Sequence, residues 1–263
     1  MAKDLKRRAY LYLRRQLLRG QLRAGTTISP YAIAREMGIS HTPVREAISR
    51  LESEGLVQHV PRLGPQVRRL GRTELEELFD LRRVLECGAV ELASERAAPA
   101  QLDEMQDLCR QYGEKVRDAR KQGLQHYGGP LIEAMDQIDL RLHMLIVAAA
   151  ASPRLVKLLG DLSLLRRVFQ HGQDRDVAGL TVLQRVSRIH RDHTQVVEAL
   201  CSRDAPAARE AMTRHIKRAR EIHLRLFEQQ ASQNGRSLDD ASLLDDALLL
   251  EDAPPEDADG SGS

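Results

Sequence analysis

Between Ile28 and Val67, apolar positions recur with a helical period in two short stretches that Gly38 separates. Ser29 and Pro30 open the first stretch as a good N-cap and a good first helical residue. The second stretch opens with the same order of capping residue and proline, and two short apolar segments around Gly64 predict a strand pair. The apolar positions that define the two helices are Ile33, Ala34, Met37, Val44, Ala47, Ile48 and Leu51.

Two short helices joined by a glycine-containing turn form a helix-turn-helix, whose second helix can enter a major groove. In that second helix, Arg45, Ser49 and Arg50 are expected to face solvent while the apolar positions face the core. The strand pair adds a wing with its turn near Gly64. The pattern therefore predicts a winged helix-turn-helix within residues 1–70.

The charge distribution agrees with a DNA-binding module. Residues 1–70 carry fourteen Lys/Arg and five Asp/Glu, a net charge of +9, although the whole chain carries only +2. A basic module within a near-neutral protein is typical of phosphate binding. A helical bundle with solvated arginines is the alternative, and the charge together with the turn pattern favours DNA binding.

From about Thr73 the apolar period is helical almost without interruption, and no alternating apolar and polar runs occur beyond the wing. Helices are expected from about Thr73 to Ala98, from Pro99 to Lys121 and from Leu131 to Ala151, and another opens at Asp204. The pattern predicts a mainly α protein with an all-helical domain at residues 71–230. The first of these helices carries the stripe Leu75, Leu78, Leu81, Leu85, Ala89 and Leu92.

Composition narrows the class further. No run reaches the roughly 20 apolar residues of a membrane span, and the N-terminus lacks the apolar region of a secretion signal. Three cysteines without metal-binding spacing (Cys87, Cys109 and Cys201) are expected to be small core residues of a cytoplasmic protein.

Beyond Gln230 the chain changes character. Residues 231–263 hold nine acidic residues and one arginine, so this tail is expected to be disordered. A solubilising tail is the simpler interpretation. The alternative is that the acidic-hydrophobic stretch from Leu243 to Ala253 forms a transient amphipathic helix that docks on a basic surface.

A second chemical signal lies in the helical domain. Asp139 and His143 are four residues apart on one predicted helix, so their side chains project from the same face. His193 and His215 lie on two later predicted helices. One carboxylate with three imidazoles suits Zn, Ni, Co, Mn or Fe. By spacing alone, coincidence is the more common explanation of such a pair.

The pattern G-I-S-H-T-P-V-R-E-A-I-x-R-L-x-x-x-G-L-V resembles the N-terminal domain of the GntR family of bacterial transcriptional regulators, and the likeness extends over residues 5–67. The resemblance implies that Ser40, Thr42 and Arg45 approach DNA and that Gly64 forms the wing tip. Three positions depart from the family, since common arginines are replaced by Tyr31, His41 and Leu63. Arg62 lies next to Leu63. Each lost guanidinium removes a bidentate contact, so a different operator is expected. The expected DNA-binding set is Tyr31, Ser40, His41, Thr42, Arg45, Arg50, Arg62 and Gly64.

Residues 73–225 resemble the effector-binding (FCD-type) domain of the FadR branch of this family, on the segments D-L-R-L-H-M-L-I-V-A-A-A-A-S-P and D-H-T-Q-V-V-E-A-L-C-S-R-D-A-P-A-A-R-E-A-M-T-R-H-I. The resemblance implies a helical bundle around a cavity, with a divalent metal held by Asp139, His143, His193 and His215. Ser152 stands where the family commonly has Asn, and QGLQHYGGP resembles an insertion. A polar core network without metal is the rival interpretation, and His190 is a substitute ligand.

The segment L-F-D-L-R-R-V-L-E resembles the first helix of that effector domain. Arg82 is expected either to clamp a carboxylate of the effector or to pair with Glu86 one turn later. The resemblance implies a homodimer on a palindromic operator and favours repression, with residues 68–73 as the linker. A metal-dependent hydrolase and a non-specific architectural DNA binder are the contrasting classes.

Overall fold

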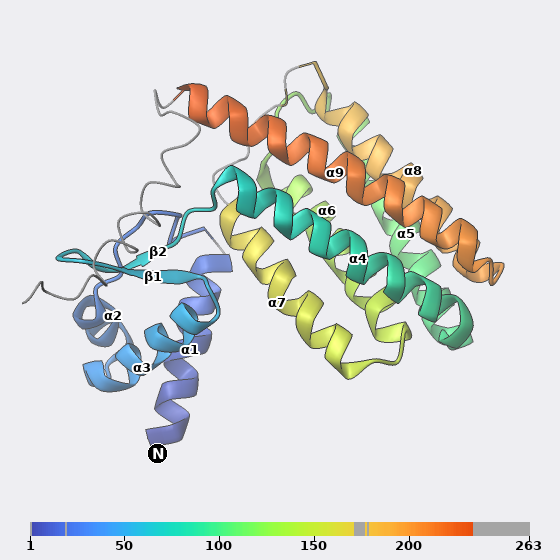
Figure 1. Cartoon of the computed structure of the whole chain (residues 1–263). Helices are drawn as coiled ribbons and strands as arrows, with labels where there is room; N and C mark the ends of the chain where they lie inside the picture. Colours follow the sequence, from blue (N-terminus) through green and yellow to red (C-terminus); the bar gives the residue numbers. More distant parts are fainter. Residues whose placement is uncertain (1, 19, 171–176, 178, 234–263) are drawn as a thin grey trace, which may run out of the picture.

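The computed structural model describes residues 2–18, 20–170, 177 and 179–233. Figure 1 shows a small winged-helix domain beside a larger bundle of long helices. The first domain contains α1 (Ala2–Leu18), α2 (Pro30–Met37), α3 (His41–Ser53), β1 (Val57–Val60) and β2 (Gly64–Val67). The second contains α4 (Arg72–Arg96), α5 (Pro99–Lys121), α6 (Gly129–Ala149), α7 (Pro153–Gln170), α8 (Val182–Cys201) and α9 (Ala205–Gln233).

Local signals set the ends of the helix-turn-helix. The Ser29 hydroxyl accepts a hydrogen bond of 3.2 Å from the backbone N–H of Ala32, so it caps α2. Gly38 ends that helix with a φ of +66°, a left-handed conformation that a side chain disfavours. α3 packs on α1 and α2, and its apolar face joins a core built from Ala9, Leu13, Leu17, Val44, Ala47, Ile48, Leu51 and Leu56.

The wing is a two-stranded antiparallel sheet. Val57 pairs with Val67 at the base and Val60 pairs with Gly64 at the tip. Gly64 has a φ of +83°, which allows the chain to reverse within three intervening residues. Buried Val57 and Val67 fix the sheet to the winged-helix core, so the tip projects from it.

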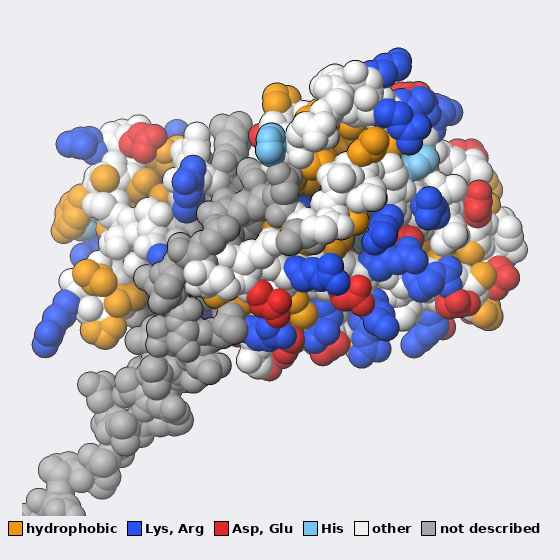
Figure 2. All heavy atoms as spheres, turned by 90° about the horizontal axis from the view of Figure 1, so that it is seen from above, with side chains coloured by type: hydrophobic (Ala, Val, Ile, Leu, Met, Phe, Trp, Pro, Cys, Tyr) orange, Lys and Arg blue, Asp and Glu red, His pale blue; other side chains and the backbone are white. Residues whose placement is uncertain are grey.

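The helical domain is an antiparallel bundle in which α4 packs on α9, and α8 packs on both α9 and α5. α6 lies between α5 and α4, and α7 packs on α4 and α6. On the face seen in Figure 2, basic and acidic side chains are interspersed over this domain. The apolar side chains that fill the bundle include Phe79, Val90, Met105, Leu108, Leu142, Ile146, Val196, Leu200, Met212 and Ile216.

The linker joins the two cores directly. Leu70 packs against the core of the winged helix and also against the core of the bundle. Glu74 accepts a 2.9 Å hydrogen bond from the N–H of Gly71 and pairs with Arg68. A displacement of the start of α4 therefore acts on both domains.

The predicted architecture is confirmed, with small shifts at helix ends. α6 begins at Gly129, two residues before the expected start, because Pro130 suits a first helical turn. α9 continues to Gln233, three residues into the segment expected to be disordered. Residues 234–263, including the stretch from Leu243 to Ala253, lie outside the described residues. No described helix has the length and apolar character that crossing a membrane requires.

Candidate functional site

The exposed face of α3 carries several of the expected DNA contacts. Thr42 and Arg45 are exposed on this helix, and Ser40 precedes its first residue with its backbone extended. Tyr31 is 62% exposed, and its ring lies 5.1 Å from the ring of His41. Two of the three residues that replace common arginines, Tyr31 and His41, thus form one aromatic pair beside the start of α3.

The remaining expected contacts are placed differently. Arg62 is exposed at the wing turn with a φ of +66°, next to Gly64. Arg50 is exposed as well, but its Nε donates to Glu54 at 3.0 Å and its Cζ lies 3.8 Å from the Tyr10 ring centroid. Arg50 therefore helps to hold α3 against α1, a role that periodicity alone did not reveal.

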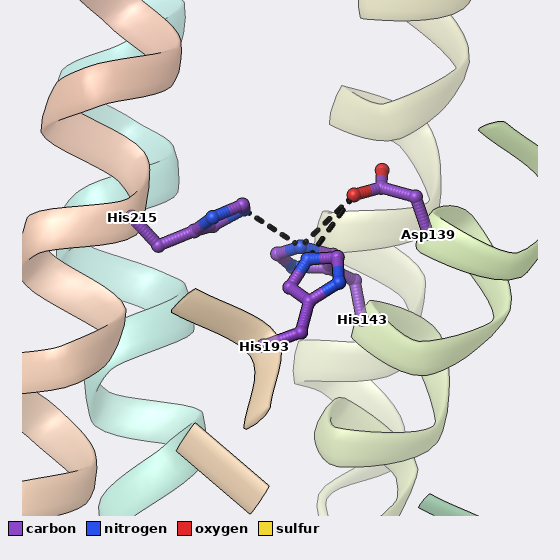
Figure 3. A group of neighbouring side chains, drawn as sticks. All are labelled: Asp139, His143, His193 and His215. Atoms are coloured by element: carbon purple, nitrogen blue, oxygen red, sulfur yellow. Dashed lines mark hydrogen bonds and ion pairs between the residues drawn. The ribbon is translucent and has the colours of Figure 1, made fainter. Parts of the chain in front are cut away.

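Asp139, His143, His193 and His215 converge in the bundle from α6, α8 and α9 (Figure 3). One potential ligand atom from each side chain lies within 4.8 Å of those of the other three. His143 Nε2 is 3.2 Å from His215 Nε2 and 3.8 Å from Asp139 Oδ1. His193 Nε2 is 3.2 Å from Asp139 Oδ1. The group forms a candidate metal site with three histidines and one aspartate.

These residues fit a divalent metal in both spacing and chemistry. Tetrahedral ligands about 2.0–2.1 Å from zinc are separated by about 3.3 Å, close to the shorter distances here. His193 is buried, yet neither of its ring nitrogens has a hydrogen-bond partner, because its approach to Asp139 lacks hydrogen-bond geometry. A coordinated cation would satisfy Nε2. Burial also lowers the pKa of His215 to about 4, so its imidazole is neutral at pH 7, as a metal ligand must be.

A second layer of carboxylates orients two of the imidazoles. Glu86 of α4 lies 2.5 Å from His143 Nδ1 and also accepts a 2.6 Å hydrogen bond from Arg82 Nε. Burial opposes ionisation of Glu86, but Arg82 and His143 outweigh it and hold its pKa well below the usual range. Asp192 Oδ2 lies 3.8 Å from His215 Nδ1, and Arg218 donates to this carboxylate. These contacts involve Nδ1 of His143 and Nδ1 of His215, so Nε2 of both rings faces the centre of the group.

Replacing Glu86 with Gln is expected to weaken Zn²⁺ binding by roughly 10-fold to 100-fold, the usual effect of removing an outer carboxylate. The amide keeps the shape of the side chain but removes the charge that favours the required tautomer of His143. Competition with a chromogenic chelator measures the affinity. Glu91→Gln, on the exposed side of the same helix and paired with Arg209, is the matched control. Equal affinities of Glu86→Gln and wild type would contradict this role.

The candidate ligands border a cavity of about 580 Å³. Asp139 and His215 line it, so the candidate metal site borders this space. Arg82 lines it too, and its Nε donates to Glu86, so the predicted pair is present. The clamp on an effector carboxylate stays a prediction. Its lining also includes Tyr112, Tyr127, Arg185 and Arg218.

His190 and the three cysteines, which the sequence also singled out, have structural roles. His190 lies outside the four-residue group and stacks on Tyr112, with ring planes 5° apart. Cys87 and Cys109 are buried, Cys201 is half-buried, and all three thiols are free, as expected of core residues. Burial raises the pKa of Cys109 to about 12. Sequence analysis missed Asp192 and Arg185, although the acid directly precedes His193 and the arginine lies about two turns earlier.

A basic winged helix joined to a helical domain with a cavity defines a class, a DNA-binding regulator with an effector-binding domain. The family model described as bacterial regulatory proteins, gntR family, matches residues 5–67, and the FCD domain model matches residues 77–218. The chain therefore belongs to the GntR family of transcriptional regulators, in the group with an FCD domain. Members of this family bind DNA and small effectors and are not enzymes, which removes the hydrolase alternative.

Relatives and solved structures agree with this assignment. An HTH-type transcriptional regulator from Streptomyces ambofaciens is 30% identical over 214 residues, covering 81% of this chain and 82% of the relative. LutR from Bacillus subtilis is 22% identical over 226 residues, covering 80% and 97%. The structure of McbR/YncC from E. coli has a TM-score of 0.65 at 23% identity, covering 86% and 98% of the two chains. A putative GntR regulator from Rhodococcus sp. RHA1 has a TM-score of 0.64 at 22% identity, covering 82% and 95%.

Proposed function

We propose that the protein is a sequence-specific repressor, acting in the cytoplasm, whose operator affinity depends on a small carboxylate or sugar acid bound beside a divalent metal. The observation that carries this proposal is that Asp139 and His215, two of the four candidate ligands, line the cavity of about 580 Å³. This volume lies within the roughly 300–1,000 Å³ typical of small-molecule sites. An effector in the cavity would therefore meet the metal site directly.

The proposed metal ligands are Asp139, His143, His193 and His215, and the ion is Zn, Ni, Mn, Co or Fe. A bound cation supplies a positive centre that attracts anionic oxygens of the effector. Arg82 also lines the cavity, and its N–H groups other than the Nε that Glu86 accepts are the proposed donors to the effector. These features support an acidic effector over a neutral or basic one.

The route from cavity to DNA runs along α9. His215, Arg218 and Leu226 of this helix line the cavity, and Glu228 pairs with Arg72 at the first residue of α4. Leu70, two residues before Arg72, touches both cores. An effector changes DNA affinity only if it binds the two domain arrangements unequally, and a coupling of about 1–3 kcal/mol gives roughly 5–150-fold. The α9–α4 contact is well placed to carry that coupling.

Replacing Glu228 with Gln is expected to reduce the effector-induced change in operator affinity by about 1.5-fold to 5-fold, because an exposed ion pair contributes about 0.2–1 kcal/mol. Effector affinity is expected to stay within about twofold, because Glu228 does not line the cavity. Operator affinity is measured with and without the effector by fluorescence anisotropy. Glu210→Gln, on the same helix and paired with Arg214, is the matched control. A variant Glu228→Gln that responds as strongly as wild type would contradict this route.

We further propose that two chains form a homodimer through their helical domains and place two copies of α3 about one DNA turn apart. Dimers of this kind read palindromic operators, because the two-fold axis of the protein matches that of the site. Each α3 would present Ser40, Thr42 and Arg45 to base edges. Tyr31 and His41 would contact DNA beside them, while Arg50, Arg62 and Gly64 would lie along the backbone.

Selection of bound sequences from a random DNA library tests this function. The selection is done once with metal-loaded protein and once with protein from which a chelator has removed the metal. A palindromic enriched site with a specificity ratio of roughly 1,000 or more would support a specific regulator. The absence of any enriched site, with binding that only decays as salt increases, would identify a non-specific architectural binder instead. Loss of transcription from the selected site when the protein is added in vitro tests the direction of regulation.

A further inference from the structure

One cavity residue has buried N–H donors without an acceptor. Arg185 of α8 is 8% exposed and lines the cavity, yet its Nε and Nη1 have no hydrogen-bond partner. A buried guanidinium whose N–H groups are unpaired is costly, and native proteins rarely leave such groups unsatisfied. The other buried arginine of the cavity, Arg82, differs because Glu86 accepts its Nε.

The position of Arg185 is set by an aromatic ring from another element. Its Cζ lies 3.6 Å from the centroid of Tyr127, and the Tyr127 hydroxyl donates to Asp136 at 2.9 Å. Tyr127 lies in the Gly- and Tyr-containing segment between α5 and α6, which resembled an insertion in the sequence. A stacked ring covers one face of the guanidinium, but it cannot accept the N–H groups at its edges. Nε and Nη1 therefore have no acceptor among the described residues, although the Arg185 side chain borders the cavity.

Arg185 and the candidate metal site share this cavity. Burial raises the pKa of Tyr112, Tyr127 and Asp139 raise it further, and Arg185 opposes that rise. Tyr112, Asp139 and Arg185 all line the cavity. A small molecule inside it therefore meets a metal-binding cluster and, separately, a guanidinium with unpaired donors.

We propose that Arg185 anchors an oxyanion of the cavity ligand, a carboxylate or a phosphate, at a subsite separate from the group that faces Asp139, His143, His193 and His215. The inference rests on the proposed effector function and adds to it a ligand with two polar ends. Nε and Nη1 of Arg185 donate to one end, and Tyr127 holds the guanidinium in place. Tyr127 is thus a positioning residue, and Arg185 is the binding residue.

The test uses the full-length, Zn²⁺-loaded protein with succinate and inorganic phosphate as separate probes at constant ionic strength. Isothermal titration calorimetry is expected to show binding of at least one probe, weakened by roughly 10-fold to 100-fold in Arg185→Gln. Arg185→Lys is expected to retain part of the affinity. Arg191→Gln, which removes an exposed charge from the same helix, is the matched control and is expected to bind as wild type does. The probe that binds identifies the oxyanion as carboxylate or phosphate.

A second variant tests the same subsite if Arg185→Gln fails to fold. Tyr127→Leu keeps the charge but removes the stacked ring, so probe binding is expected to weaken by roughly 2-fold to 30-fold. Equal probe binding by wild type and Arg185→Gln, or no binding to wild type at about 20 mM, overturns the assignment. Zn²⁺ content is measured in every variant. A wild-type protein that binds neither Zn²⁺ nor an operator would contradict the proposed function. The oxyanion subsite is tested separately, by the probe affinities of wild type and Arg185→Gln.

Discussion

Replacing His143 with Ala is expected to abolish tight Zn²⁺ binding. His143 lies at the centre of the group, since its Nε2 approaches His215 and Asp139 while its Nδ1 contacts Glu86. Complete four-ligand zinc sites bind with about 10–16 kcal/mol, so an equal share per ligand predicts a loss of roughly 100-fold to 1,000-fold. The variant also removes the His143 contact of the buried Glu86 carboxylate and leaves it paired with Arg82.

Metal-dependent thermal stability measures this effect. A ligand present at about 1,000 times its dissociation constant stabilises the folded state by about 4 kcal/mol, and the variant should lose most of that gain. His190→Ala is the control, because His190 is one turn from His193 but stacks on Tyr112 outside the group. Stoichiometric tight Zn²⁺ in His143→Ala would contradict the role of this residue as a ligand. A wild type without Zn²⁺-dependent stabilisation would indicate that the four side chains form a polar core network instead.

The architecture was predictable because its signals are local. Ser29, Pro30 and Gly38 act within one or two turns, and the glycine at the wing tip acts within its own hairpin. The pair Asp139 and His143 likewise follows from the geometry of one helix. That His193 and His215 meet this pair depends on the packing of three helices, and the family resemblance implied it where spacing alone did not.

What escaped prediction depends on how each helix is rotated against its neighbours. Arg50 falls on a polar position of α3, and only the packing of α3 on α1 brings it over Tyr10. Arg82 was compatible with the cavity or with Glu86, and the rotation of α4 allows both. Arg185 was missed because its partner Tyr127 lies in an irregular segment, where no periodicity indicates the direction of a side chain.

Replacing Arg45 with Ala is expected to reduce affinity for the selected operator by roughly 5-fold to 150-fold, the range of a base contact worth about 1–3 kcal/mol. Arg45 is exposed on α3, and the residues opposite it on this helix are fully buried in the core. The substitution is therefore expected to leave the fold intact and to remove a guanidinium from the surface that we propose faces DNA. Arg110→Ala, which removes an exposed charge from α5, controls for net charge.

Competition between operator and random DNA separates a base contact from a phosphate contact. If Arg45 reads a base, the variant loses operator affinity while its weak binding to random DNA changes little, so the specificity ratio falls. If it contacts only phosphate, both affinities fall together and the salt slope decreases by about one. A uniform loss would move sequence reading to Tyr31 and His41, because exposed Tyr31 packs against half-buried His41 beside the start of α3. Tyr31→Ala would then lower the specificity ratio in place of Arg45→Ala.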